Sequence, residues 1–136
     1  MPSPVAEIPA AEPDIAAAHY AAKLAFETDC SDVHAAFAAG KSDFVLLDVR
    51  SPALFAQSHL PGAINLPHGK MTAHRMSEWA RDTLFVVYCA GPHCNGADKA
   101  ALRLAKLGLK AKLMIGGMTG WADEGFAFEQ GVPVAA

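Results

Sequence analysis

The sequence is poor in several features that would mark a specific class of protein. Only 18% of its 136 residues are charged, and its lysines and arginines form no cluster. Binding to nucleic acid needs a concentrated basic surface, so we expect no nucleic acid among the partners. No apolar stretch approaches the roughly 18 to 20 residues of a membrane-spanning helix. We therefore expect no membrane association either.

Cysteine is also scarce, and its three copies are Cys30, Cys89 and Cys94. A small, odd number of cysteines does not make the disulfide framework of a small secreted domain. The first residues carry no positive charge ahead of an apolar segment, as a secretory signal would. Together these two features predict a cytoplasmic location. Cys30 is most simply interpreted as a small buried residue.

The length of the chain suits one domain with a substantial core. Residues 1–13 contain four prolines, so we expect residues 1–22 to be an N-terminal extension, partly irregular with a short helix over 14–22. Residues 23–136 are expected to form the folded domain. Its apolar runs predict strands over 24–28, 44–47, 63–65, 84–88 and 111–115, and its helical patterns predict helices over 32–39 (capped by Ser31), 52–57, 71–80, 96–107 and 119–124.

The order and character of these elements predict the fold class. Strands alternate with helices, which is typical of α/β domains with a largely parallel sheet. Most of the strands are uniformly apolar, as expected when both faces of a sheet are covered. The prediction is a single α/β domain with a largely parallel five-stranded sheet, flanked by helices on both faces.

Cys89 has the most informative setting in the chain. It follows the apolar run 84–88 directly, and a short loop separates it from the helix predicted over 96–107. The N–H groups of such a loop and the positive end of a following helix favour negative charge, so a thiolate is expected at Cys89. The alternative is a structural thiol at a strand end. The candidate loop consists of Ala90, Gly91, Pro92, His93, Cys94, Asn95 and Gly96.

Three segments together resemble the rhodanese-like (sulfurtransferase) family. The first runs from Leu46 to Asn65 and contains Asp48-Val49-Arg50 and, further on, His59-Leu60-Pro61-Gly62-Ala63. The second is Val86-Val87-Tyr88-Cys89, which enters the candidate loop. The third is Ile115-Gly116-Gly117-Met118 with Trp121 and Gly125. The resemblance covers residues 24–128, nearly all of the foldable chain, and implies a single rhodanese-like domain.

The resemblance implies an enzyme, a sulfurtransferase of the thiosulfate sulfurtransferase type. Cys89 would accept sulfane sulfur from thiosulfate, a persulfide or a polysulfide, hold it as a persulfide, and pass it to a thiol, cyanide or a protein. Loop N–H groups would cradle the bound sulfur, although Pro92 has none to offer. Asp48 and Arg50 would support the loop structurally. Met118 and Trp121 would wall the pocket, with ordinary core packing the equal alternative for Trp121. No cofactor is implied.

The loop also departs from the family pattern. An arginine commonly closes the family's active loop, and Cys94 stands in its place. Rhodanese-fold phosphatases and arsenate reductases need an arginine where this chain has Asn95, so phosphatase activity is not expected. A loop without basic residues also weakens thiosulfate as a donor and favours a persulfide, a polysulfide or a protein partner. Leu54 replaces an acidic residue of the signature, which we interpret as a minor surface change.

Several alternatives stay open at this point. Cys94 is a passive loop residue, a resolving thiol, or the partner of Cys89 in a regulatory disulfide, which requires Cα atoms within about 7 Å. His93 orients an anion or faces solvent, and His59 is most simply structural. The histidines show no metal-ligand spacing, so no metal site is expected. Instead of an enzyme, the domain could be a non-catalytic binding or regulatory module, or a Cys89/Cys94 redox sensor.

Overall fold

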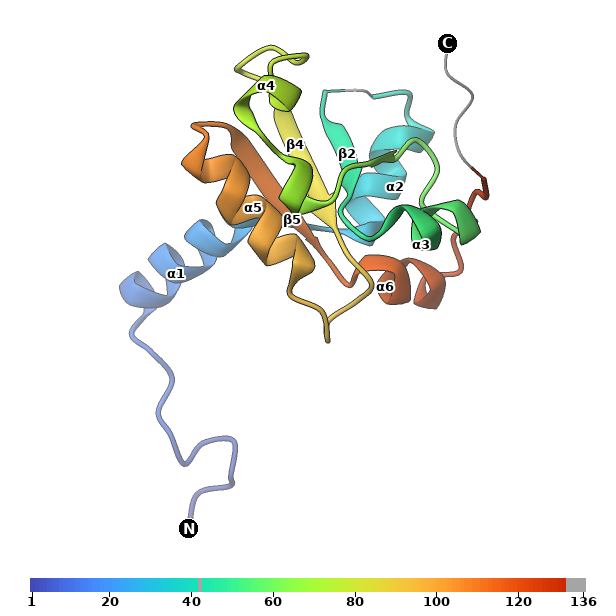
Figure 1. The fold of residues 1–136 in the computed structure, drawn as a ribbon. Coiled ribbons are helices and arrows are strands. Elements are labelled where there is room, and N and C mark those ends of the chain that lie inside the picture. The colour runs from blue at the N-terminus through green and yellow to red at the C-terminus, as the bar shows by residue number, and fades with distance from the viewer. Residues whose placement is uncertain (42, 132–136) are drawn as a thin grey trace.

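The computed structural model describes residues 1–41 and 43–131, so the end of the predicted domain range, at 132–136, lies outside them. A five-stranded sheet in the order β1-β5-β4-β2-β3, with every adjacent pair parallel, lies between layers of helices (Figure 1). This confirms the predicted α/β fold. The strands are β1 (Glu27–Asp29), β2 (Val45–Asp48), β3 (Ile64–Asn65), β4 (Leu84–Tyr88) and β5 (Lys110–Ile115). The helices are α1 (Pro13–Phe26), α2 (Cys30–Ala38), α3 (Pro52–Gln57), α4 (Ala73–Met76), α5 (Gly96–Lys106) and α6 (Gly117–Asp123), with a 3-10 turn, η1 (His68–Lys70).

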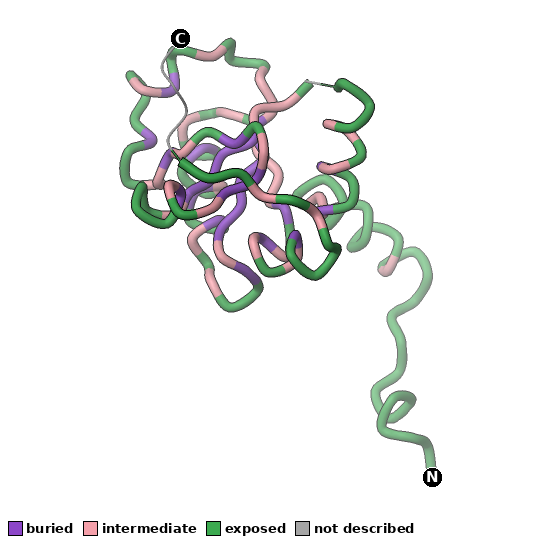
Figure 2. The backbone as a smooth tube through the Cα atoms, turned by 90° about the vertical axis from the view of Figure 1, so that its right-hand side faces the viewer, coloured by how far each residue is buried: buried purple, intermediate pink, exposed green. Residues whose placement is uncertain are grey.

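Strand β4 shows why both faces of the sheet are covered. Its alternate side chains Phe85 and Val87 belong to a core with residues of α4 and α5, whereas Val86 and Tyr88 belong to a second core with residues of α2, α3 and α6. Successive side chains of a strand point to opposite faces, so a uniformly apolar strand must be buried on both. Figure 2 shows the buried residues gathered along the strands at the centre of the domain.

The carboxyl ends of all five parallel strands meet at one edge of the sheet. There, the register places Asp48 of β2 beside Tyr88 of β4, and Asp29 of β1 beside Ile115 of β5. Ligands of open α/β sheets bind outside the carboxyl ends of the strands. Cys89, which follows Tyr88, therefore lies on the edge where a site is expected.

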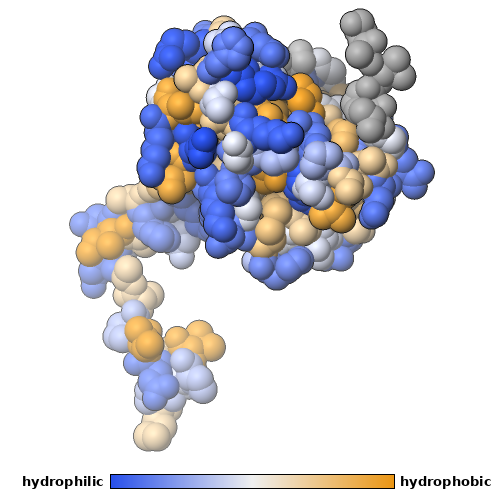
Figure 3. All heavy atoms as spheres, viewed as in Figure 1, coloured by the Kyte–Doolittle hydropathy of each residue, from blue (hydrophilic) through white to orange (hydrophobic). Residues whose placement is uncertain are grey.

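The N-terminal helix is longer than the sequence predicts. α1 continues through the segment predicted as a strand over 24–28, and only residues 27–29 are extended. The segment is rich in alanine, and an ion pair between Lys23 and Glu27 joins successive turns at its end, which favours helix. Within the described chain, α1 buries none of its residues, and its apolar side chains lie on the surface (Figures 2 and 3). Nowhere in residues 1–41 and 43–131 is a helix both long and apolar enough to cross a bilayer.

Two other helix predictions need correction. α2 begins two residues earlier than predicted, because Asp29 and not Ser31 caps it by accepting the Asp32 N–H at 2.8 Å. The helix predicted over 71–80 is reduced to η1 and the single turn α4. The Ser77 hydroxyl donates to the His74 carbonyl at 2.5 Å, which competes with continuation of the helix.

Candidate active site

The loop after β4 folds back on itself. Cys89 leaves the central strand, and the Cys94 N–H donates to the Gly91 carbonyl at 3.0 Å, closing a turn. α5 then begins at Gly96, and its first turn faces the loop. The turn returns Cys94 to Cys89 and places both sulfur atoms near the positive end of an 11-residue helix.

Main-chain bonds from α6 hold this loop from its other side. The Met118 N–H donates to the Cys89 carbonyl at 3.1 Å, and the Thr119 N–H donates to the Ala90 carbonyl at 3.0 Å. This approach requires Gly117, whose φ is +56° and whose added Cβ would lie 2.3 Å from the Cys89 carbonyl oxygen. The loop carbonyls are thus engaged by α6. Gly116, with φ of +90°, also adopts the left-handed backbone region.

The two loop thiols are in direct contact. The Sγ atoms of Cys89 and Cys94 lie 2.6 Å apart, and the Gly96 N–H donates to Cys94 Sγ at 3.4 Å. Cys89 is buried, with 8% of its surface exposed, whereas Cys94 is half-buried. A Cβ on Gly96 would lie 2.9 Å from Cys89 Sγ, so a glycine is needed at the start of α5 for the pair to fit.

The pKa shifts of the two thiols differ from the sequence expectation. Burial raises the pKa of Cys89 to about 11, its hydrogen bond to Cys94 adds to this, and the N–H groups of Ala90 and Gly96 offset only part of it. The pKa of Cys94 is lowered, first by the hydrogen bond from Cys89 and then by the Gly96 N–H. Of the two thiols, Cys94 is therefore the one that loses its proton more readily. The sequence favours a thiolate at Cys89, whereas burial raises the pKa of Cys89 because desolvation outweighs the loop N–H groups.

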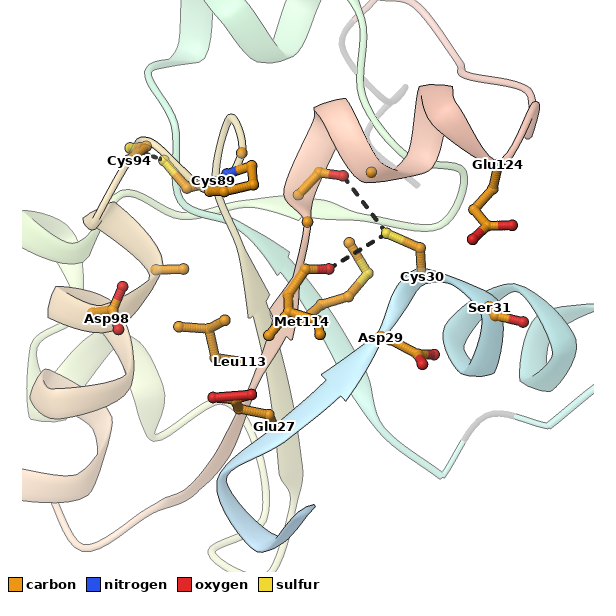
Figure 4. Close-up of a pocket in the computed structure, with 17 residues that line it drawn as sticks. Glu27, Asp29, Cys30, Ser31, Cys89, Cys94, Asp98, Leu113, Met114 and Glu124 are labelled. Carbon is orange, nitrogen blue, oxygen red and sulfur yellow. Dashed lines mark hydrogen bonds between the residues drawn. The ribbon is translucent and has the colours of Figure 1, made fainter. Parts of the chain in front are cut away.

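The pair opens into a cavity of about 640 Å³ between the loop, β1, β5 and the start of α6. Figure 4 shows Cys89 and Cys94 on one side of this cavity and Cys30 on another. Main-chain atoms of Gly116, Gly117 and Gly120 form part of the wall. Four carboxylate residues also line the cavity, and among its described lining residues there is no lysine or arginine. These are Glu27, Asp29, Asp98 and Glu124.

The loop residues divide between two hollows. Gly91, Pro92 and Cys94 line the cavity, while Ala90, His93 and Asn95 lie with Pro92 and Cys94 around a shallow hollow on the outer side of the loop. The Cys94 N–H is used within the turn and is not available to a bound sulfur. Fewer N–H groups therefore act on the Cys89 sulfur than the sequence predicts. They are those of Ala90 and Gly96.

Asp48 and Arg50 belong to a buried network beside the loop. Arg50 donates through Nη2 to Asp48 Oδ2 at 2.7 Å and to the Ser58 carbonyl at 2.6 Å. The Tyr88 hydroxyl donates to Asp48 Oδ2 at 2.7 Å and accepts the Leu60 N–H at 3.1 Å. Neither Asp48 nor Arg50 lines the cavity. Their contacts are structural, and they fix the strand end from which Cys89 departs.

Met118 and Trp121 do not line the cavity, so the prediction that they wall the pocket is wrong. The alternative for Trp121, ordinary core packing, is what the structure has. Trp121 is 2% exposed, lies within the core beneath α6, and donates through Nε1 to the Ala127 carbonyl at 2.9 Å. Met118 packs against the same core. On this side the cavity is lined instead by Gly116, Gly117 and Gly120, at and within the start of α6.

Sequence reasoning missed the lining residues on the β1 side. Cys30 is a buried small residue as interpreted, but it also lines the cavity together with Glu27 and Asp29. The signal was present, since Glu27 and Asp29 belong to β1 and Cys30 follows its carboxyl end. It was lost because the strand was placed over 24–28 instead of 27–29.

Comparison with known proteins agrees with the fold. The pattern of the rhodanese-like domain matches residues 29–124. A protein called sulfurtransferase from Allochromatium vinosum is 36% identical over 90 residues, covering 64% of this chain and 79% of that protein. The HTH-type transcriptional regulator Rv0324 of Mycobacterium tuberculosis is 34% identical over 92 residues. That match covers 68% of this chain but only 40% of the regulator's length.

Solved structures share the architecture. The BH2092 protein of Bacillus halodurans superimposes with a TM-score of 0.84 and 34% identity, over 88% of this chain and 87% of that one. A thiosulfate sulfurtransferase from Pseudomonas aeruginosa has a TM-score of 0.66 at 24% identity, over 82% of this chain and 21% of its own, which shows a shared fold. By its sequence pattern and its fold, the chain belongs to the rhodanese-like domain family.

Proposed function

We propose that this domain is a sulfurtransferase in which Cys89 carries sulfane sulfur as a persulfide and passes it to a thiol or another nucleophile. The observation that carries the proposal is the position of Cys89, at the carboxyl end of the central strand and open to a cavity of about 640 Å³. Membership of the rhodanese-like family and the similarity to the sulfurtransferase of A. vinosum support it.

The thiol pair supplies a route for the proton. The Sγ atoms of Cys89 and Cys94 lie 2.6 Å apart and the pKa of Cys94 is the lowered one, so in this proposal Cys94, in its thiolate form, accepts the Cys89 proton as Cys89 attacks a donor. With a persulfide donor R–S–SH, a bond forms between Cys89 Sγ and the outer sulfur while the donor S–S bond breaks. The proton held by Cys94 then leaves with the departing thiol, R–SH. Transfer to an acceptor thiol reverses these steps.

The charge of the cavity indicates the class of donor. Thiosulfate is a dianion and would meet the carboxylates of Glu27, Asp29, Asp98 and Glu124 without a basic lining residue to offset them. A persulfide on a neutral or positively charged carrier, such as a basic protein segment, avoids this repulsion. We infer that such a persulfide is the better donor and that thiosulfate is a poor one.

A second candidate function is a regulatory module that reports the state of the two thiols. The observation that favours it is the 34% identity to the regulator Rv0324, since a relative of this domain occurs in a protein named a transcriptional regulator. Such a module would react with the donor once and not turn over.

Intact-protein mass spectrometry tests the proposal. Reduced protein and its Cys94→Ser and Cys89→Ser variants are exposed to thiosulfate, to the persulfide of cysteamine, and to the persulfide of mercaptopropionate. In Cys94→Ser, which keeps Cys89 but lacks the second thiol, we expect a gain of about 32 Da that is absent from Cys89→Ser, reached fastest with the cationic persulfide and slowest with thiosulfate. Absence of the gain from every donor, in both wild type and Cys94→Ser, would overturn the proposal and favour the module.

Steady transfer to an added thiol separates the enzyme from the module. An enzyme releases many equivalents of transferred sulfur per chain while donor and thiol last. A module stops after about one equivalent, the single loading of Cys89.

A further inference from the structure

The second thiol of the loop has no role in simple sulfur transfer beyond holding a proton. Cys94 nevertheless contacts Cys89 Sγ at 2.6 Å and is the more exposed of the two residues. The turn closed by the Cys94 N–H and the Gly91 carbonyl holds it in this position, and the Gly96 N–H contacts its sulfur. This arrangement places the Cys94 sulfur where it can attack Cys89 Sγ as a nucleophile.

We propose that Cys94 is a resolving thiol, which gives the domain a second activity: reductive release of the bound sulfur as hydrogen sulfide. This inference rests on the proposed persulfide at Cys89. The cavity lining and the loop turn both support it, because they leave Cys94 beside the inner sulfur of such a persulfide.

The chemical step balances without any outside oxidant. The Cys94 thiolate attacks Cys89 Sγ, a Cys89–Cys94 disulfide bond forms, and the bond from Cys89 Sγ to the outer sulfur breaks. The outer sulfur leaves as HS⁻ with the electron pair of that bond. The two cysteine sulfurs are oxidised and the sulfane sulfur is reduced to sulfide. An external dithiol then reduces the disulfide and restores the pair.

The surroundings favour this outcome. HS⁻ is released into a cavity lined by four carboxylates, which repel the anion and disfavour its return. The third cysteine is not an equivalent partner, because Cys30 donates its thiol to the Ile115 and Gly117 carbonyls at 3.6 and 3.7 Å. Burial also raises the pKa of Cys30 to about 11, which keeps it a thiol.

The test is a single turnover without added thiol. Reduced wild-type protein and its Cys94→Ser and Cys89→Ser variants receive one equivalent of cysteamine persulfide, and released sulfide is measured. Trypsin is expected to cleave after Arg81 and Lys99, so both loop cysteines stay in one peptide, residues 82–99, and Cys30 falls in another. Serine keeps the size and hydrogen bonding of Cys94 but cannot form a disulfide.

The wild type should release about one equivalent of sulfide and yield peptide 82–99 about 2 Da lighter than its dithiol form. Cys94→Ser should keep the added sulfur, about 32 Da, and release sulfide at least tenfold more slowly. The inference is overturned if wild type keeps the sulfur, if Cys94→Ser releases sulfide at the wild-type rate, or if the disulfide maps to Cys30. Absence of both sulfide release by the wild type and sulfur gain by Cys94→Ser would instead refute the persulfide at Cys89.

Discussion

Two groups of polar side chains lie at the same edge of the sheet, and they differ in how fully they are paired. Beside β2, Asp48 is bonded by Arg50 and Tyr88, and Arg50 also bonds the Ser58 carbonyl. Beyond β4, the Sγ atoms of Cys89 and Cys94 contact each other at 2.6 Å, and Cys94 Sγ also accepts the Gly96 N–H. The first group is held by several hydrogen bonds and an ion pair, whereas the second leaves two thiols beside an open cavity.

The two groups are joined by adjacent residues of one strand. Tyr88 belongs to the first group, and Cys89, the next residue, belongs to the second. The register pairs Asp48 with Tyr88, so the saturated network fixes the strand end from which the reactive loop departs. Tyr88 therefore belongs to the rigid network at this edge of the sheet, and the adjacent Cys89 belongs to the thiol pair. Breaking either group should therefore have distinct effects.

The largest effect on folding is expected for Asp48→Asn. The change leaves the buried Arg50 guanidinium, 8% exposed, without its counter-charge, and breaking a buried ion pair in this way costs about 3–5 kcal/mol. Denaturant unfolding measures the loss. The matched control is Glu78→Gln, which breaks an exposed pair with Arg75 and should cost no more than about 1 kcal/mol. Equal costs for the two variants would contradict the contrast between buried and exposed pairs.

An intermediate effect is expected for Gly117→Ala, which acts where α6 holds the loop. The new Cβ would meet the Cys89 carbonyl at 2.3 Å and occupy a backbone with φ of +56°. Strain of this kind costs about 1–3 kcal/mol, and the loop must shift, so sulfur loading of Cys89 should also slow. Gly125→Ala has a similar positive φ but open space around it. If Gly117→Ala loads sulfur as well as Gly125→Ala does, the hydrogen bonds from α6 to the loop do not affect the loading of Cys89.

The smallest effect on folding is expected for Cys94→Ser, within about 0.5 kcal/mol of wild type, because the residue is only half-buried. Its effect on reactivity is large by contrast. One equivalent of iodoacetamide at neutral pH should label Cys94 in the wild type, because the thiolate reacts and the pKa of Cys94 is lowered. Cys89, with its pKa raised to about 11, should be labelled only in alkaline solution. Preferential labelling of Cys89 at neutral pH would contradict the conclusion that Cys94 has the lower pKa of the two thiols.

Much of the fold could be predicted from local patterns. The strand predicted over 84–88 and the helix predicted over 52–57 have the bounds of β4 and α3 as the structure has them. Elsewhere, local signals competed. The segment 24–28 mixes apolar and polar residues, and helix continuation from the alanine-rich segment decided its structure. Ser77 ended α4 through a hydrogen bond that a periodicity count does not include.

The position of the candidate site could be predicted from the sequence, but the order of the Cys89 and Cys94 pKa values could not. That Cys89 ends a central strand follows from its sequence context. Which thiol of the pair is ionised depends on burial and on a contact between the two sulfurs, and neither has a sequence signature. The Asp48–Tyr88 bond joins residues 40 positions apart. The cavity wall was missed for a similar reason, since β1 and β5 are distant in the chain and meet only through the parallel sheet.

The main-chain hydrogen bonds from α6 to the loop determine how the loop responds to a change of pH and to substitution of its side chains. The N–H groups of Met118 and Thr119 bond the carbonyls of Cys89 and Ala90, and peptide groups do not titrate. The loop therefore keeps its shape across a wide pH range while the thiols change their charge. Because these bonds involve no loop side chain, His93 and Asn95 on the outer surface are free to vary. If Cys89 carries sulfur as proposed, substitutions at this surface change which acceptor is recognised while the main-chain frame of the loop is kept.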